Sequence, residues 1–237
     1  MTADNRKFRH EFKYIISDSE AAILESRISA LIPRDPHVGD SGVYTIRSLY
    51  FDSYTDRCYY ENEDGTDPRE KFRVRIYNAS TGRISLECKR KERSKTLKTS
   101  CILTPEQCRC LMDGRTPSDV TERQATLRRL VMLMECELFR PKVIVEYDRT
   151  PYIWKWGNVR VTFDRNIRSS AQTARFTREE LFTRPIMPAG QHLLEVKYDE
   201  YLPDFIKESL ELGSLSQTAF SKYYLCRRFS SGGRYDI

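Results

Sequence analysis

Residues 71–77, with the sequence KFRVRIY, alternate basic and apolar side chains with a period of two. In a β-strand this spacing places Lys71, Arg73 and Arg75 on one face and the apolar side chains on the other. Arginine forks and lysine ammonium groups are the side chains that bind phosphate and other anions. A single strand of this kind is equally typical of a half-buried strand with its charges in water, because buried Lys and Arg are rare unless paired. The other strands therefore decide which face is inside.

Four further segments repeat the pattern, with charged or polar side chains on one face and apolar side chains on the other. The charged-face positions are Arg9, Glu11 and Lys13; Glu87, Lys89 and Lys91; Arg160, Thr162 and Asp164; and Glu195 and Lys197. Several basic faces in one sheet repel one another unless an anion lies among them. The pattern predicts a charged lumen that binds a multiply charged anion.

A few carboxylates accompany these cations, namely those of Glu11, Glu87 and Glu195. Hard divalent ions such as Mg²⁺ bind through one or two carboxylates together with phosphate oxygens. The alternative to metal binding for each glutamate is a local ion pair with a neighbouring lysine.

Turn signals divide the chain into eight strand-like segments and several amphipathic helices. Strands are expected at 7–16, 44–51, 71–77, 83–91, 95–103, 142–153, 159–167 and 192–198. Helices are expected at 18–32, at 54–60, from Thr104, and at 122–137, 203–212 and 216–228. The polar segment 168–190 receives no assignment. We expect an α+β fold with a single domain over 1–237, in which a closed eight-stranded antiparallel β-barrel carries helices on its apolar outer face.

Composition narrows the class of partner. The formal net charge of +6 favours anionic partners. The basic residues alternate with apolar ones along strands instead of forming patches with stacking aromatics, which argues against nucleic acid. Seven Cys and three well-separated His suggest neither a disulfide framework nor a zinc site. No apolar run approaches the roughly 20 residues that span a bilayer, and no signal peptide is recognised, so a cytoplasmic protein without membrane insertion is expected.

Eight short motifs in chain order carry a resemblance to a known family. They are HEFKY at 10–14, SLYFD at 48–52, KFRVRIYN at 71–78, LECKRK at 86–91, VEYDR at 145–149, VRVTFD at 159–164, LLEVKY at 193–198 and FSKYY at 220–224. Together they resemble the VTC domain, the polyphosphate polymerase branch of the triphosphate tunnel metalloenzymes, which is related more distantly to the CYTH triphosphatases.

The resemblance implies a tunnel that binds ATP or another nucleoside triphosphate together with Mn²⁺ or Mg²⁺. It also implies transfer of the terminal phosphoryl group of ATP to a growing inorganic polyphosphate chain. The phosphate-binding cations would be Lys13, Arg73, Arg75, Lys89, Lys98, Arg149 and Arg160, and Lys197 joins them from the charged face of its strand. Glu195 would bind the metal, and Lys222 would face the tunnel mouth. Lys222, Lys13, Arg73 and Arg75 are the candidate catalytic residues, and the alternative for Lys222 is a surface helix residue with its ammonium group in water.

Two positions depart from the family pattern. Strand parity groups Arg149 with Val145 and Tyr147 and not with Glu146, so a tunnel-facing Arg149 is expected to need a β-bulge or the strand end. Polymerase members carry a second lysine where this chain has Ala219. A triphosphatase on the same tunnel, and a non-catalytic sensor of polyphosphate or nucleotides, therefore stand as alternatives to the polymerase.

Overall fold

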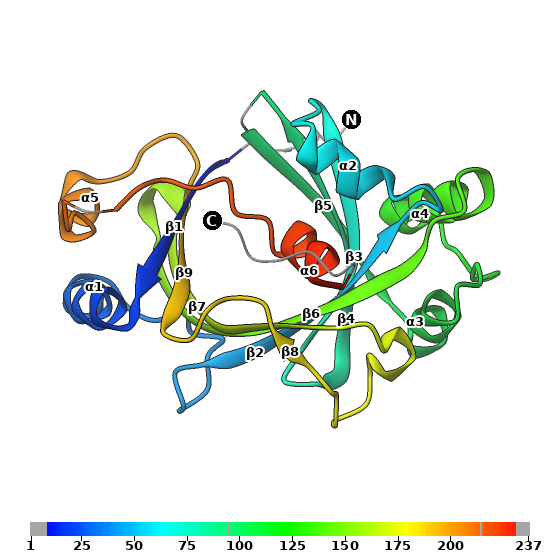
Figure 1. Cartoon of the computed structure of the whole chain (residues 1–237), viewed down its shortest axis with the longest axis horizontal. Helices are drawn as coiled ribbons and strands as arrows, with labels where there is room; N and C mark the ends of the chain where they lie inside the picture. The colour runs from blue at the N-terminus through cyan, green and yellow to red at the C-terminus, as the bar shows by residue number, and fades with distance from the viewer. Residues whose placement is uncertain (1–8, 94, 214, 231–237) are drawn as a thin grey trace.

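An antiparallel sheet of nine strands curls on itself in the computed structural model, which describes residues 9–93, 95–213 and 215–230 (Figure 1). Eight strands follow one another in the order β1-β9-β7-β6-β2-β3-β4-β5, and the two-residue β8 pairs with β7. The strands are β1 (His10–Ser17), β2 (Tyr44–Asp52), β3 (Arg69–Tyr77), β4 (Ser80–Glu92), β5 (Lys95–Leu103), β6 (Arg140–Trp154), β7 (Val159–Ser170), β8 (Arg184–Pro185) and β9 (Gln191–Tyr198). The expected α+β architecture with eight main strands is confirmed. Residues 7 and 8 of the first expected strand lie outside the described residues.

The two edge strands of the curled sheet, β1 and β5, meet at one point. Arg9 and Thr96 exchange backbone hydrogen bonds of 3.1 and 3.3 Å there. Further along β1, Tyr14 pairs with Gln217, and the backbone N–H of Thr218 donates to the carbonyl of Lys13 at 2.9 Å. A C-terminal segment therefore occupies part of the β1 edge that β5 leaves free.

Helices α1 (Asp18–Leu31) and α5 (Asp204–Ser209) cover the outer face of β1, β9 and β7. Leu24 and Ile28 of α1 are fully buried and belong to the same apolar cluster as Phe163 and Leu194 from the strands. A capping box fixes the start of α1, because Ser17 and Glu20 satisfy each other's backbone N–H groups. Along residues 161–163 and 194–196, successive side chains therefore point alternately into this apolar layer and into the lumen, as the period of two in a strand predicts.

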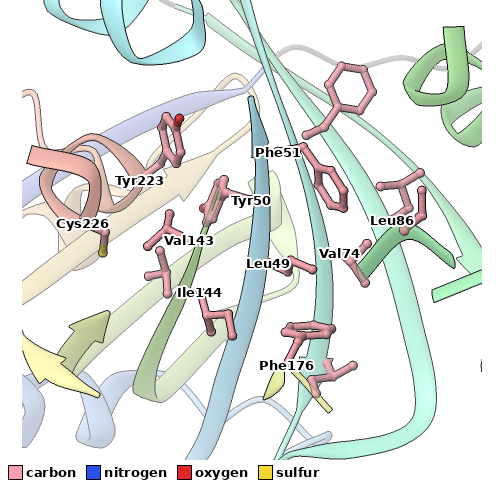
Figure 2. Packing of buried hydrophobic residues seen from close by; sticks show 14 of the residues in the cluster. Leu49, Tyr50, Phe51, Val74, Leu86, Val143, Ile144, Phe176, Tyr223 and Cys226 are labelled. Carbon is pink, nitrogen blue, oxygen red and sulfur yellow. The ribbon is translucent and has the colours of Figure 1, made fainter. Parts of the chain in front are cut away.

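Helices α3 (Pro105–Met112) and α4 (Ala125–Cys136) belong to a second apolar cluster, outside β2, β3 and β4. Figure 2 shows Phe51, Val74 and Leu86 of these strands in that cluster. The apolar partners of the basic residues in β3 therefore face outward, and their cations face inward. Helix α4 begins at Ala125, three residues later than the pattern predicts, and α2 (Arg57–Glu63) is likewise shifted along the chain from its expected position at 54–60.

The last helix, α6 (Lys222–Ser230), lies inside the curl of the sheet in Figure 1. Tyr223 and Cys226 are buried there beside Tyr50 and Val143 (Figure 2). The expectation that this helix begins at residue 216 is wrong, because the preceding residues pair with the free edge of β1 in an extended conformation. The carbonyl and hydroxyl of Ser221 then accept the N–H groups of Leu225 and Tyr224, at 3.0 and 3.3 Å, and start the helix.

The segment between β7 and β9 packs on the outside of the sheet. It contains the short helix η2 (Thr173–Arg175), and Phe176 just after it is fully buried. The buried guanidinium of Arg47 in β2 binds Glu146 and donates to the carbonyls of Phe176 and Glu179 at 3.1 and 3.3 Å. The polar segment that the sequence left unassigned is therefore held by Arg47 and by the pairing of β8 with β7.

At the β6–β7 connection, the turn η1 (Trp156–Asn158) joins the two strands as the expected hairpin. Among the described residues, no helix is long and apolar enough to cross a membrane.

Candidate functional site

The concave side of the sheet and the start of α6 enclose a cavity of about 1450 Å³. Fourteen basic and two acidic side chains are among the described residues that line it, which gives the lining a formal charge of +12. Because the whole chain carries +6, all its other residues sum to −6. The positive charge of this protein is therefore concentrated inside the sheet and is not spread over its surface.

Every site residue that the sequence predicted lines this cavity. The set is Lys13, Arg73, Arg75, Lys89, Lys98, Arg149, Arg160, Glu195, Lys197 and Lys222. These side chains come from seven strands and one helix, so only the curled sheet brings them together.

Two buried carboxylates and two buried cations form the centre of the site. Arg149 donates two hydrogen bonds to Asp164, at 2.6 and 2.7 Å, and a third to Glu195 at 3.1 Å. The ammonium group of Lys222 lies 2.6 Å from Asp164 and 2.8 Å from Glu195. Lys197 adds a second ammonium group, 2.6 Å from Glu195. Each carboxylate is thus held by at least two cations.

The neighbouring charges set the protonation of this centre. Burial raises the pKa of Glu195, but Lys197, Lys222 and Arg149 together outweigh it and hold that pKa well below its ordinary value. For Lys222 burial lowers the pKa, and the carboxylates of Asp164 and Glu195 more than reverse this effect. All four groups are therefore charged at neutral pH.

A third buried carboxylate, Glu87 on β4, organises the arginines of β3. Arg73 lies 2.7 Å and Arg75 3.5 Å from Glu87, and Lys98 approaches it to 3.2 Å. The phenol oxygen of Tyr50 accepts a further bond from Arg73 at 2.8 Å. Burial raises the pKa of Glu87, while Arg75, Arg73 and Lys98 lower it to well below its ordinary value. These contacts fix two guanidinium groups side by side in the cavity wall.

Glu11 plays the corresponding role for the lysines of β1 and β4. Its carboxylate lies 2.7 Å from Lys89 and 3.2 Å from Lys13. Burial and the nearby Lys13 and Lys197 lower the pKa of Lys89 to about 8 despite this pairing. Glu11 and Glu195 form the expected local ion pairs with Lys13 and Lys197, whereas Glu87 pairs with Arg73, Arg75 and Lys98 of other strands and not with Lys89.

Arg160 is a predicted phosphate ligand that a loop outside the sheet engages. Its guanidinium donates to Asp35 at 2.5 Å and to the phenol oxygen of Tyr44 at 3.2 Å. Asp35 is buried, so this contact anchors the loop between α1 and β2 beside the cavity.

Arg149 reaches the cavity without an extra residue in β6 between Val143 and Arg149. Tyr147 lines the cavity as well, while Glu146 faces outward and binds Arg47 and Arg168. The irregularity lies instead in the β6–β7 pairing, where Asp148 pairs with Arg165 and Glu146 with Arg168. The expectation that Arg149 needs a bulge or a strand end is therefore wrong: the tunnel face of β6 is that of Tyr147.

Sequence reasoning placed Asp164 on a charged face but gave it no role at the site. Its partner Arg149 lies directly opposite on β6, a pairing that depends on strand register and not on spacing along the chain. Two tyrosines, Tyr50 and Tyr147, were also missed, although both contact the guanidinium groups of β3. Their inward position could have been read from the alternation along β2 and β6 once one inward residue on each strand was known.

The acidic side chains do not form a preformed metal cage. Over residues 9–93, 95–213 and 215–230, no group of three or more His, Cys, Asp or Glu side chains could hold a metal ion. Glu11 and Glu195 are the two carboxylates that line the cavity, and both are engaged by lysines. A divalent ion at this site would therefore rely on one or two carboxylates and on oxygens brought by a ligand.

The sequence model of the VTC domain matches residues 8–230 of this chain. The chain belongs to the VTC domain family. No curated protein has a sequence that matches it. The expected family resemblance is thereby confirmed over nearly the whole chain.

Solved structures share the curled sheet at low sequence identity. A candidate adenylyl cyclase from Hippeastrum, described as having a dominant triphosphatase activity, is 13% identical, with a TM-score of 0.56 and 97% of each chain covered. A candidate adenylate cyclase from Bacillus halodurans is 14% identical, with a TM-score of 0.54, over 91% of this chain and 95% of that one. A third, from Vibrio parahaemolyticus, is 9% identical with a TM-score of 0.51, over 94% and 99%. The likeness shows that this chain shares the fold of these proteins.

Proposed function

We propose that this VTC domain transfers the terminal phosphoryl group of ATP to inorganic polyphosphate inside the cavity, with a divalent metal ion. The observation that carries the proposal is the convergence of fourteen cations in one enclosed space of a protein whose other residues sum to negative charge. Such a site favours a narrow, multiply charged anion that enters the sheet. A nucleic acid duplex would need the positive charge on the outside.

The geometry of the cations suits phosphate oxygens. Arg73, Arg75 and Arg149 are held by buried carboxylates and tyrosines, so their guanidinium groups are oriented before a ligand arrives. Phosphoryl transfer requires mainly alignment of the attacking and leaving oxygens and neutralisation of charge on the transferred group. Fixed arginines supply the alignment, and the more flexible lysines, Lys13, Lys89 and Lys197, can follow the charge as it moves.

Glu195 is the residue that would hold the metal, with Glu11 on the neighbouring strand β1 as a second carboxylate. Lys13 pairs with Glu195 and Glu11 with Lys197 across the β1–β9 ladder, so acids and lysines alternate there. Phosphates entering the cavity offer the lysines new partners and free the carboxylates. When bound, the ion would neutralise phosphate charge, and a donor set of two carboxylates plus phosphate oxygens fits Mg²⁺ or Mn²⁺.

The proposal is tested by incubating the purified chain with ATP and Mn²⁺, then separating products on a gel stained for polyphosphate. We expect long chains with the wild type and none with Arg73→Ala, which removes a fixed guanidinium. The control is Arg83→Ala, on the same sheet, whose exposed side chain lies outside the cavity. Chain synthesis that survives Arg73→Ala would contradict the proposal.

A triphosphatase is the second candidate, and Ala219 is the observation that favours it. The small side chain lines the cavity at a position where the polymerase members that this chain resembles carry a lysine. Free phosphate or diphosphate without chains would support hydrolysis, and Ala219→Lys should then raise the ratio of chain to free phosphate. Binding of ATP or polyphosphate without any turnover would indicate a sensor.

A further inference from the structure

Four cations form a block at the end of the cavity away from Arg149. Arg69 and Lys71 of β3 lie directly opposite Lys91 and Lys89 of β4 in the strand register. All four line the cavity. Like charges placed opposite each other on one sheet face are destabilising. The protein thus maintains an unfavourable arrangement at this position.

Three members of the block differ from the other cations of the lumen in their partners. Among the described residues, no carboxylate lies within ion-pair distance of Arg69, Lys71 or Lys91, whereas Lys89 pairs with Glu11. The ammonium group of Lys71 contacts neutral groups, the oxygens of Asn62 at 2.6 Å and Ser221 at 3.1 Å and the ring of Tyr223, whose centroid is 5.4 Å away. Arg69 donates to the backbone carbonyl of Thr66 at 2.8 Å.

The carboxylates of Glu11 and Asp67, which raise the pKa of Lys91, each bind another group. Glu11 pairs with Lys89 and Lys13, and Asp67 accepts the backbone N–H of Arg93 at 2.8 Å. Burial, Arg69 and Lys13 all lower the pKa of Lys91. The block therefore has uncompensated positive charge, unlike the arginines around Glu87 and Asp164.

The block also extends the row of cations along β3. Arg69, Lys71, Arg73 and Arg75 face the cavity at every second residue, about 7 Å apart, so the row spans about 20 Å. The other end of this row, at Arg73 and Arg75, is compensated by Glu87. A linear polyanion that lies along the row reaches the block only when it extends past these two arginines.

We propose that Arg69, Lys71 and Lys91 form a separate subsite that binds the polyphosphate chain beyond the reacting triphosphate. The inference rests on the proposed function and specifies its polymer substrate. Two lysines and an arginine with no carboxylate partner hold phosphate by charge and not by a fixed geometry, which permits a chain to move past them.

The test compares binding of tripolyphosphate with binding of long inorganic polyphosphate, by calorimetry without ATP. The variant is Arg69→Gln with Lys91→Gln, two side chains that are not fully buried. We expect its affinity for tripolyphosphate to stay within about twofold and its affinity for the long chain to fall about tenfold. The control is Arg83→Gln with Lys95→Gln, which removes the same charge from exposed positions on β4 and β5 outside the cavity.

Equal weakening of both ligands, no weakening of either, or an equal effect of the control pair would overturn the subsite. A wild-type chain that binds tripolyphosphate but not the longer polymer would overturn it too, while leaving the triphosphatase candidate standing. A wild-type chain that binds neither anion would contradict the proposed function itself.

Discussion

The ammonium nitrogen of Lys222 lies 2.6 Å from a carboxylate oxygen of Asp164, a side chain with no solvent exposure. This contact joins the first residue of α6 to the centre of β7, inside the sheet. Lys222 is therefore neither at the surface nor free to leave the cavity unless Asp164 and Glu195 receive another cation. The centre of the site is a set of fixed charges that a ligand must rearrange.

Asp164→Ala should destabilise the fold. It leaves Arg149 and Lys222 buried without their main partner, and breaking such a pair typically costs about 3–5 kcal/mol in free energy of unfolding. Denaturant unfolding measures this loss. Asp113→Ala, which removes an exposed acid paired with Arg115, should change the same free energy by less than about 1 kcal/mol. If Asp164→Ala has the same free energy of unfolding as the wild type, Asp164 does not compensate the buried charges of Arg149 and Lys222 as described.

Glu195→Gln should raise the Mn²⁺ concentration needed for half-maximal turnover by about tenfold or more. The amide keeps the shape of the side chain but loses the charge that would attract the ion. The measurement is a metal titration of turnover, starting from protein stripped with a chelator. Glu87→Gln is the matched control, because Glu87 is equally buried and pairs with Arg73 and Arg75. The metal requirement of this variant should stay unchanged. An unaltered requirement in Glu195→Gln would remove this residue from the metal site.

Affinity for long inorganic polyphosphate should fall as pH rises through 7. Burial, Arg69 and the nearby Lys13 and Lys89 lower the pKa of Lys71 to about 7, and a bound anion favours the charged ammonium. The folded state releases this proton near pH 7 and the unfolded chain near 10.5, so the same group makes the fold more stable as pH rises between those values.

The pH effect is measured by titrating long inorganic polyphosphate into wild type and Lys71→Met across pH 6 to 9. Measurements with Lys71→Met still include the ionisation of the ligand but not that of the lysine. The plot of affinity against pH for this variant should therefore lack the step near pH 7. Identical profiles for the two proteins would contradict the role of Lys71.

Tyr223→Phe should lower kcat with little change in KM. The Tyr223 hydroxyl donates to Asp52, whose carboxylate also accepts the N–H groups of Ser53, Cys58 and Tyr59. This contact ties α6 to β2 and α2, and the residue beside it is Lys222. Losing it should cost about 1–3 kcal/mol of stability and loosen the position of Lys222.

Tyr224→Phe is the control for that change, because the Tyr224 hydroxyl donates to Glu63 at the surface. A higher KM in Tyr223→Phe, or an equal loss of kcat in both variants, would argue against positioning by Tyr223.

The faces of β3 and β9 could be predicted from sequence because charged and apolar residues alternate along 71–76 and 194–198. Period-two alternation determines which side chains share a face, and several basic strands in one chain then determine that the face is internal. For β6 the alternation was ambiguous, since Glu146, Tyr147, Asp148 and Arg149 offer polar groups on both faces. The outward direction of Glu146 is set by Arg47 on the adjacent strand, a partner 99 positions away.

The start of α6 and the role of Asp164 required the tertiary structure. Residues 216–221 have no strong signal against a helix, and only the free edge of β1 favours the extended form. Asp164 pairs with Arg149 because the β6–β7 hairpin sets the two in register. Both features depend on contacts between segments, which spacing along one segment does not encode.

The bridge between Arg9 and Thr96 joins the edge strands β1 and β5, and the line along which these two strands meet is the seam of the sheet. Away from that bridge, β1 and β5 are held by side chains and by the segment at Gln217 and Thr218, so this line should open locally more often than any other strand pair. An anion that contacts Lys13 on one side and Lys98 on the other would cross the seam. Amide hydrogens along β1 and β5 should then exchange with solvent more slowly when the lumen is filled, so the ligand itself completes the closure of the barrel.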